Sequence, residues 1–224
     1  MPEAPTRPRV VIIGGGFGGI AAARALRRAN VDITLIDRTN HFIFQPLLYQ
    51  VATAALAPSD ITAPIRWILR SQRNTEVLMA EARKIDTERR VVLIDDDLHE
   101  LPYDYLIVAP GSRHHYFGHD GWEPYAPGLK AIEDASEIRR RFLLAYEIAE
   151  KSEDPQERDE YLTFVIVGGG PRPSSLPSEL LARSRRPPIF PDKSRGGLGG
   201  SWAGMNAEYP SGPGLLLYQM ARPR

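Results

Sequence analysis

The N-terminal part of the chain places two short apolar runs on either side of a helical stretch. Residues 9–13 end in Val-Val-Ile-Ile, a continuous β-branched run typical of a strand covered on both faces. Residues 20–28, rich in Ala and Arg, predict a helix, and residues 32–36 predict a second strand. The three segments therefore predict a βαβ unit at the start of an α/β fold.

A glycine-rich turn joins the first strand to the helix. Gly14, Gly16 and Gly19 fill the spacing G-x-G-x-x-G, and Asp37 follows the second strand. Gly14 permits a tight turn, Gly16 leaves bare backbone against a pyrophosphate, and Gly19 allows close helix–strand packing. The helix N-terminus offers N–H groups to phosphates, and Asp37 can accept hydrogen bonds from an adenosine ribose. The pattern predicts a dinucleotide site, and both NAD and FAD use this fingerprint.

The following segments are less regular. Residues 39–52 carry aromatic and amide groups without a clean helical period, which suits the lining of a flat ligand. A helix is predicted from Asp60, with Pro64 in its first turn. Residues 131–150 predict an amphipathic helix, and we assign its triplet 139–141, Arg-Arg-Arg, to a solvated face rather than to nucleic-acid binding. The side chains expected to point inward are those of Ile132, Ile138, Phe142, Leu143, Tyr146 and Ile148.

Three further strands are predicted between these two helices. Residues 76–80 and 90–94 form short apolar runs joined through residues 84–88, and residues 103–109 lead into Pro-Gly. We interpret them as a β-meander that ends in a buried strand. The loop after this strand would then lie against the predicted dinucleotide site.

The amino-acid composition limits the kinds of site that this chain can form. Equal numbers of basic and acidic residues, 28 each, and 42% hydrophobic residues fit one or two soluble domains. The absence of Cys excludes a thiolate zinc site, an iron–sulfur cluster or a redox dithiol built from these 224 residues. No apolar stretch approaches the roughly 20 residues of a membrane-spanning helix, and the Pro-spaced N-terminus does not resemble a signal peptide, so a cytoplasmic location is expected.

The last quarter of the chain differs from the rest. Residues 171–224 hold eight basic and three acidic residues, and nine of the 20 Pro. Because Pro interrupts backbone ladders, we expect an irregular Pro/Gly/Arg-rich tail over 172–224.

These motifs resemble the two-dinucleotide-binding-domain flavoproteins and, within them, the type II NADH:quinone oxidoreductases. The resemblance covers residues 9–171 and is carried by residues 11–19, 44–52 (Phe-Gln-Pro-Leu-Leu-Tyr-Gln-Val-Ala), 104–112 with 115–119, and 127–130. It implies a Rossmann-like FAD/NAD(P)-binding α/β domain with an inserted β-meander and an incomplete second dinucleotide-binding domain.

The resemblance also implies a set of FAD-binding positions. These are Gly14, Gly16, Phe17 and Gly19 at the pyrophosphate, Asp37 and Arg38 at the adenosine, Gln45 and Pro46 at the flavin, the backbone of Ala82 at the adenine, and Ala109 and Gly111 from the returning strand.

The implied chemistry belongs to the cofactor. FAD takes a hydride from NADH, the substrate, and passes electrons to quinone, so no side chain needs to be a nucleophile. His114, His115, His119 and Asp120 lie in a loop without a metal-ligand spacing, and no metal is expected. The intact relatives are implied to be peripheral on the cytoplasmic face of a membrane, but no attachment segment is visible here.

A second glycine motif departs from the family pattern. Residues 161–167 read as a strand leading to Gly168 and Gly170, as an NADH-binding domain should begin, but the third motif position is Pro173. With one permitted choice of codons, the message for residues 173–177 encodes Val-Glu-Leu-Ala in a shifted frame. We hypothesise a frameshift near Pro171, and a genuine divergent tail is the alternative.

The expected organisation is therefore a disordered segment 1–8, an incomplete FAD-binding domain 9–160, the first strand and glycine turn of an NADH-binding domain 161–171, and the tail. The expected function is that of a truncated NADH dehydrogenase of the quinone-reducing type, with weak FAD retention and little NADH oxidation. The alternatives are another FAD/NAD(P)-dependent pyridine nucleotide oxidoreductase, or a non-catalytic dinucleotide-binding fragment.

Overall fold

The computed structural model describes residues 7–95, 99–112, 115–116, 118–167 and 216–219. The chain divides into two compact units. Unit 1 comprises Met1–Ile43 and Thr62–Ser112, and unit 2 comprises Phe44–Ile61 and Arg113–Arg224. Each unit is described by itself.

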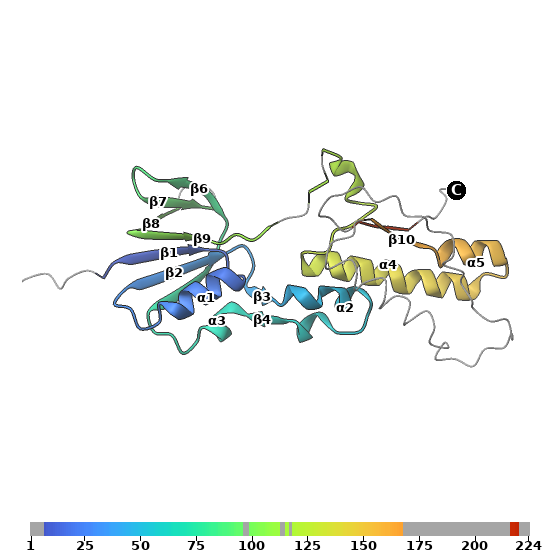
Figure 1. The fold of residues 1–224 in the computed structure, drawn as a ribbon, viewed down its shortest axis with the longest axis horizontal. Coiled ribbons are helices and arrows are strands. Elements are labelled where there is room, and N and C mark those ends of the chain that lie inside the picture. The colour runs from blue at the N-terminus through green and yellow to red at the C-terminus, as the bar shows by residue number, and fades with distance from the viewer. Residues whose placement is uncertain (1–6, 96–98, 113–114, 117, 168–215, 220–224) are drawn as a thin grey trace, which may run out of the picture. The chain divides into compact units, whose positions relative to one another are not determined.

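Unit 1 is built around a four-stranded parallel sheet (Figure 1). Its strands are β1 (Arg9–Ile13), β2 (Asp32–Asp37), β5 (Thr75–Met79) and β9 (Tyr105–Val108), in the order β5-β2-β1-β9. The helix α1 (Phe17–Ala25) connects β1 to β2, which confirms the predicted βαβ unit. It begins three residues before the predicted start, directly after the glycine turn.

The two faces of this sheet carry different layers. The helices α1 and α3 (Ile65–Ile68) cover one face, and the antiparallel strands β6 (Ala82–Asp86), β7 (Val91–Ile94) and β8 (His99–Pro102) cover the other (Figure 1). The first face buries Val10, Ile12, Ile20, Ala23, Ile33, Leu35, Ile65 and Leu69. The second buries Val11, Ile36, Ala80, Val92, Ile94 and Tyr103. Successive residues of β1 thus enter opposite cores, which explains its unbroken apolar run.

The predicted helix from Asp60 is wrong at its start. Pro58–Asp60 forms a 3-10 turn (η2), and Thr62–Pro64 forms β4, which pairs antiparallel with β3 (His41–Ile43). Pro64 is extended, with φ −58° and ψ 130°, and only from Ile65 does α3 begin. The ring of a proline disfavours helical backbone in the residue before it, so the helix cannot form through Ala63.

The predicted meander also needs correction. Residues 76–80 do not belong to it, because β5 is an edge strand of the parallel sheet and pairs with β2. The expected connection 84–88 instead contributes β6, and β8 precedes β9 where no separate strand was predicted. The meander is therefore β6-β7-β8, and it leads into the parallel strand β9.

Unit 2 is mainly helical. It contains η1 (Gln45–Leu47), α2 (Leu48–Ala52), η3 (Asp120–Trp122), α4 (Ile132–Lys151), α5 (Pro155–Tyr161) and the antiparallel pair β10 (Phe164–Val167) and β11 (Leu216–Gln219). The long helix α4 confirms the amphipathic helix predicted for residues 131–150. The strand β11 gives residues 216–219 regular structure within the expected irregular tail, and residues 172–215 lie outside the described residues.

The buried face of α4 differs in part from the expected one. Ala135, Ile138, Phe142, Ala145 and Ala149 are buried, whereas Leu143, expected to point inward, is 43% exposed. The small alanines allow close packing along this face, and Phe142 contacts the ring of Phe164 at 5.3 Å.

The arginine triplet of α4 is only partly a solvated face. Arg139 donates to the carbonyl of Leu56 at 2.8 Å, and Arg141 donates to the carbonyls of Pro124 and Tyr125. These bonds tie two loops of unit 2 to α4, because a guanidinium can satisfy several carbonyls at once.

Candidate functional site

The glycine turn of unit 1 packs tightly against residues at the ends of the neighbouring strands. Gly14 has φ +102°, and its N–H donates to the carbonyl of Ile36 at 2.8 Å. A Cβ at this position would overlap the carbonyl oxygen of Ala109, which follows β9. Both the positive φ and this close approach require glycine. The turn therefore lies at the carboxyl ends of β1, β2 and β9, where ligands bind in open α/β sheets.

The third glycine of the motif packs the helix onto the turn. A Cβ on Gly19 would overlap the carbonyl oxygen of Gly14 and would lie 3.3 Å from a methyl of Ile12. The fold itself therefore requires the absence of a side chain here, as expected for close helix–strand packing.

The middle glycine is different. Gly16 is the N-cap of α1, with φ −80° and ψ −161°, a backbone conformation open to any residue. A Cβ there would meet nothing within 4 Å. Within the described residues, neither packing nor backbone conformation explains this glycine. The beginning of α1 adds N–H groups without intrahelical partners and the positive end of the helix dipole.

Asp37 is held beside the turn. Its Oδ2 accepts a hydrogen bond from the Gly15 N–H at 2.6 Å, and its Oδ1 accepts from the N–H and hydroxyl of Thr39 at 2.7 and 2.8 Å. A carboxylate offers about four acceptor positions, so three bonds leave room for one ribose hydroxyl. Sequence reasoning missed Gly15 and Thr39, although Asp-x-Thr is the pattern of an Asx turn.

The remaining predicted positions of unit 1 have different surroundings. Phe17 is half exposed, and its ring contacts Phe42 edge to face at 4.9 Å. Ala109 donates its N–H to Ile13, and Gly111 has φ +74°. Arg38 is exposed next to Asp37, whereas Ala82 packs against the core below the meander.

The predicted flavin-side positions belong to unit 2. Gln45 donates its side-chain amide to the carbonyl of Lys130 at 3.2 Å, and Pro46 lies in the first turn of η1. Gly168 and Gly170 lie outside the described residues, as does His114. His119 stacks on Trp122 at 4.2 Å.

In the described part of the chain, no group of three or more His, Asp or Glu is arranged to hold a metal ion. None of the helices in this part has the length and apolar character needed to cross a membrane.

A parallel sheet with helices on one face, an antiparallel meander on the other and a G-x-G-x-x-G turn facing an acidic residue defines a dinucleotide-binding domain of the flavoprotein type. The family model for pyridine nucleotide-disulphide oxidoreductases matches residues 8–172, and the chain belongs to this family.

Curated relatives and solved structures agree with this membership. The chain is 50% identical over 171 residues to the type II NADH:quinone oxidoreductase Ndh of Mycobacterium tuberculosis, covering 75% of this chain and 37% of that protein. It is also 50% identical over 182 residues to NdhA of the same organism, covering 80% and 39%. The structure of NDH2 from Plasmodium falciparum in complex with NADH matches with a TM-score of 0.67 and 28% identity, covering 77% of this chain and 36% of that one. The chain thus spans less than two fifths of the length of these relatives.

Proposed function

We propose that the glycine turn of unit 1 binds the adenosine diphosphate half of FAD. The open backbone at Gly16 is the observation that supports this most strongly, because no contact among the described residues accounts for a glycine there. A bound pyrophosphate would lie against Gly16 and the first turn of α1, and Asp37 would hold the adenosine ribose.

Other residues would complete the proposed cofactor site. Gly14 and Gly19 keep α1 close to β1, which directs the helix N-terminus toward the phosphates. Arg38 would face the adenosine end, and Ala109 with Gly111 would approach the cofactor from β9. Gln45 and Pro46 in unit 2 would serve the flavin side. Flavin, when bound, supplies hydride acceptance and onward electron transfer.

The reaction we propose for the whole protein is transfer of a hydride from NADH to FAD, followed by electron transfer to a quinone. Two relatives at 50% identity are named for this activity. The family also includes enzymes that reduce disulfides, but these 224 residues contain no Cys to form a redox pair. Quinone is therefore favoured as the electron acceptor.

A second candidate is a dinucleotide-binding module with little turnover. Pro173 occupies the position where an NADH-binding glycine motif needs its third Gly, and proline cannot provide close backbone packing at a helix start. The family match ends at residue 172, next to this departure.

Spectroscopy with the purified chain tests both candidates. FAD is added under anaerobic conditions, followed by NADH and then by a soluble quinone. We expect saturable FAD binding with slow bleaching of the visible flavin band by NADH, and restoration of the band by quinone. Binding without bleaching supports the module, and failure to bind FAD contradicts both candidates. Rapid, repeated turnover contradicts the expected impairment at Pro173.

A further inference from the structure

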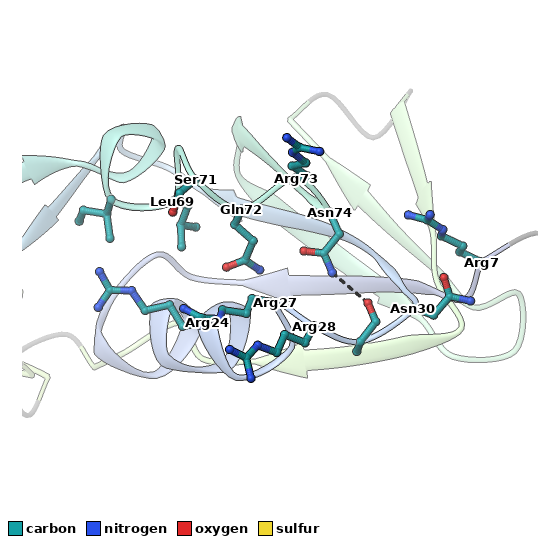
Figure 2. A pocket seen from close by; sticks show the side chains of 12 residues that line it. Arg7, Arg24, Arg27, Arg28, Asn30, Leu69, Ser71, Gln72, Arg73 and Asn74 are labelled. Atoms are coloured by element: carbon teal, nitrogen blue, oxygen red, sulfur yellow. Dashed lines mark hydrogen bonds between the residues drawn. The ribbon is translucent and has the colours of Figure 1, made fainter.

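An open cleft of about 840 Å³ lies at the C-terminal end of α1, opposite the end at the glycine turn. The last turn of α1 and the turn that follows it form one side, and the loop between α3 and β5 forms the other (Figure 2). All of its lining residues belong to unit 1.

The lining is strongly basic. Arg24 lies in the last turn of α1, and Arg27 and Arg28 lie in the turn that follows the helix, with Arg7 and Arg73 farther along the rim. No Asp or Glu lines the cleft. Arg7 is paired with Asp32 at 3.6 Å. Within the described part of the chain, the three α1-side arginines have no acidic partner. Like charges on one turn repel each other, so the cleft carries an uncompensated positive potential.

Basic residues at a helix C-terminus often serve the last carbonyls of the helix. Here three of the last four carbonyls of α1 already have other partners. Those of Ala22 and Arg24 accept backbone N–H groups, and that of Ala23 accepts the side-chain amide of Gln72 at 2.7 Å. In the turn after the helix, Asn74 donates to the carbonyls of Leu26, Ala29 and Val31 at 3.2 to 3.3 Å. The guanidinium groups are therefore not needed at these carbonyls.

The same amide bonds hold the two sides of the cleft together. Gln72 and Asn74 extend from the loop toward the end of α1, whereas Arg73 extends away from it (Figure 2). Gln72 is itself fixed by a 2.7 Å bond to the hydroxyl of Thr75. The backbone that carries Arg24, Arg27 and Arg28 is thus anchored to its neighbours.

We propose that this cleft binds clustered phosphoryl groups through Arg24, Arg27 and Arg28. Guanidinium groups form paired, charge-assisted hydrogen bonds with phosphate oxygens, and several adjacent phosphates would offset their mutual repulsion. The volume is within the range of small-ligand sites. A soluble oligophosphate and the headgroups of an anionic lipid surface offer the same chemistry, and the two sources are separated by experiment.

Calorimetric titration with inorganic tripolyphosphate and co-sedimentation with vesicles test the proposal on the full chain. The vesicles contain phosphatidylcholine alone or equal parts of phosphatidylcholine and phosphatidylglycerol. The test variant is R24Q/R27Q/R28Q, since Gln has nearly the helix propensity of Arg. The control variant R83Q/R89Q/R140Q changes the net charge equally. It removes three exposed ion pairs and one bond from Arg83 to the carbonyl of Asp95, all of them away from the cleft.

We expect the test variant to lose roughly tenfold or more in affinity for the anion that binds, and the control variant to stay near the wild type. Binding of tripolyphosphate identifies a soluble ligand, and binding only of the anionic vesicles identifies a lipid surface. Binding should weaken as salt is raised.

Gly16→Ala, at the other end of α1, should leave binding of the anion unchanged, which separates this site from the dinucleotide site. Circular dichroism verifies folding, and Arg28→Gln, outside the helix, replaces the triple variant if that unfolds.

Absence of binding to either anion overturns the proposal. Equal losses in the test and control variants overturn it as well, because they would show a response to net charge alone.

Discussion

At the scale of single residues, the three glycines of the turn have two distinct causes. Gly14 and Gly19 are required by the protein's own backbone, which a Cβ would overlap. At Gly16, no contact with the described residues requires a glycine. The spacing of the motif predicts all three positions alike, and only the structure separates the two that the fold needs from the one that it does not, which we propose is needed for a ligand.

This difference predicts unequal losses of stability. Gly19→Ala should lower the free energy of unfolding by about 1–3 kcal/mol, because the helix must move away from the Gly14 carbonyl. Gly16→Ala should lower it by less than about 1 kcal/mol, since its methyl group meets no neighbour. Urea unfolding of both variants checks this, and equal losses would show that the close approach at Gly19 is wrong.

Asp37 combines a structural with a ligand-binding role. Asp37→Asn places an amide where Oδ2 accepts the Gly15 N–H, so we expect a loss of about 1–3 kcal/mol in stability. The affinity for FAD should fall roughly tenfold, because the ribose loses a charged acceptor.

The matched control for Asp37→Asn is Asp60→Asn, which disturbs a 2.7 Å bond from the Ala57 N–H in unit 2. It should lower stability without changing the affinity for FAD. A similar loss of affinity in both variants, measured by titration, would remove the proposed role of Asp37.

At the scale of elements, long periodic or continuous apolar segments were predicted well, and short ones were not. The strands β1 and β2 and the helix α4 follow from their patterns. The strands β3 and β4 have three residues each, too few to show a period of two. The placement of β5 depends on which partner it pairs with, β2 or β6, and that choice is made by tertiary packing rather than by local pattern.

The helix α4 carries an electrostatic cluster with a predictable pH dependence. Glu137 accepts two hydrogen bonds from Arg140 at 2.8 Å and one from Arg141 at 2.7 Å. These bonds, first that from Arg140, lower the pKa of Glu137 from 4.5 to about 2. Because the folded-state pKa lies below the ordinary one, the stabilisation is complete above pH 4.5 and is lost as the pH falls toward 2.

Glu137→Gln should therefore flatten the stability of unit 2 against pH over this window. Urea midpoints recorded from neutral to acidic pH measure the effect. The control is Glu147→Gln on the same helix, whose carboxylate forms no ion pair within the described residues. A wild type and a Glu137→Gln variant with parallel pH profiles would contradict the assignment.

At the scale of the whole molecule, the two units differ in how far sequence predicts their candidate positions. In unit 1, the glycine turn and Asp37 could be predicted because their motif is local in sequence, whereas Ala109 and Gly111 were predicted only through family resemblance. Gln45 and Pro46 were predicted only through family resemblance, since their role depends on long-range packing that no local pattern contains. The basic cleft was missed because its residues come from separate segments of the chain.

The central claim is that the open backbone at Gly16 exists for a cofactor. Titration of the full chain with FAD, followed by flavin fluorescence, tests it in the wild type, in Gly16→Ala and in Gly121→Ala. Gly121 is the matched control, because a Cβ there also meets nothing within 4 Å and it lies in unit 2. We predict that Gly16→Ala weakens FAD binding roughly tenfold or more while Gly121→Ala leaves it unchanged. Equal affinity in all three proteins would contradict the account.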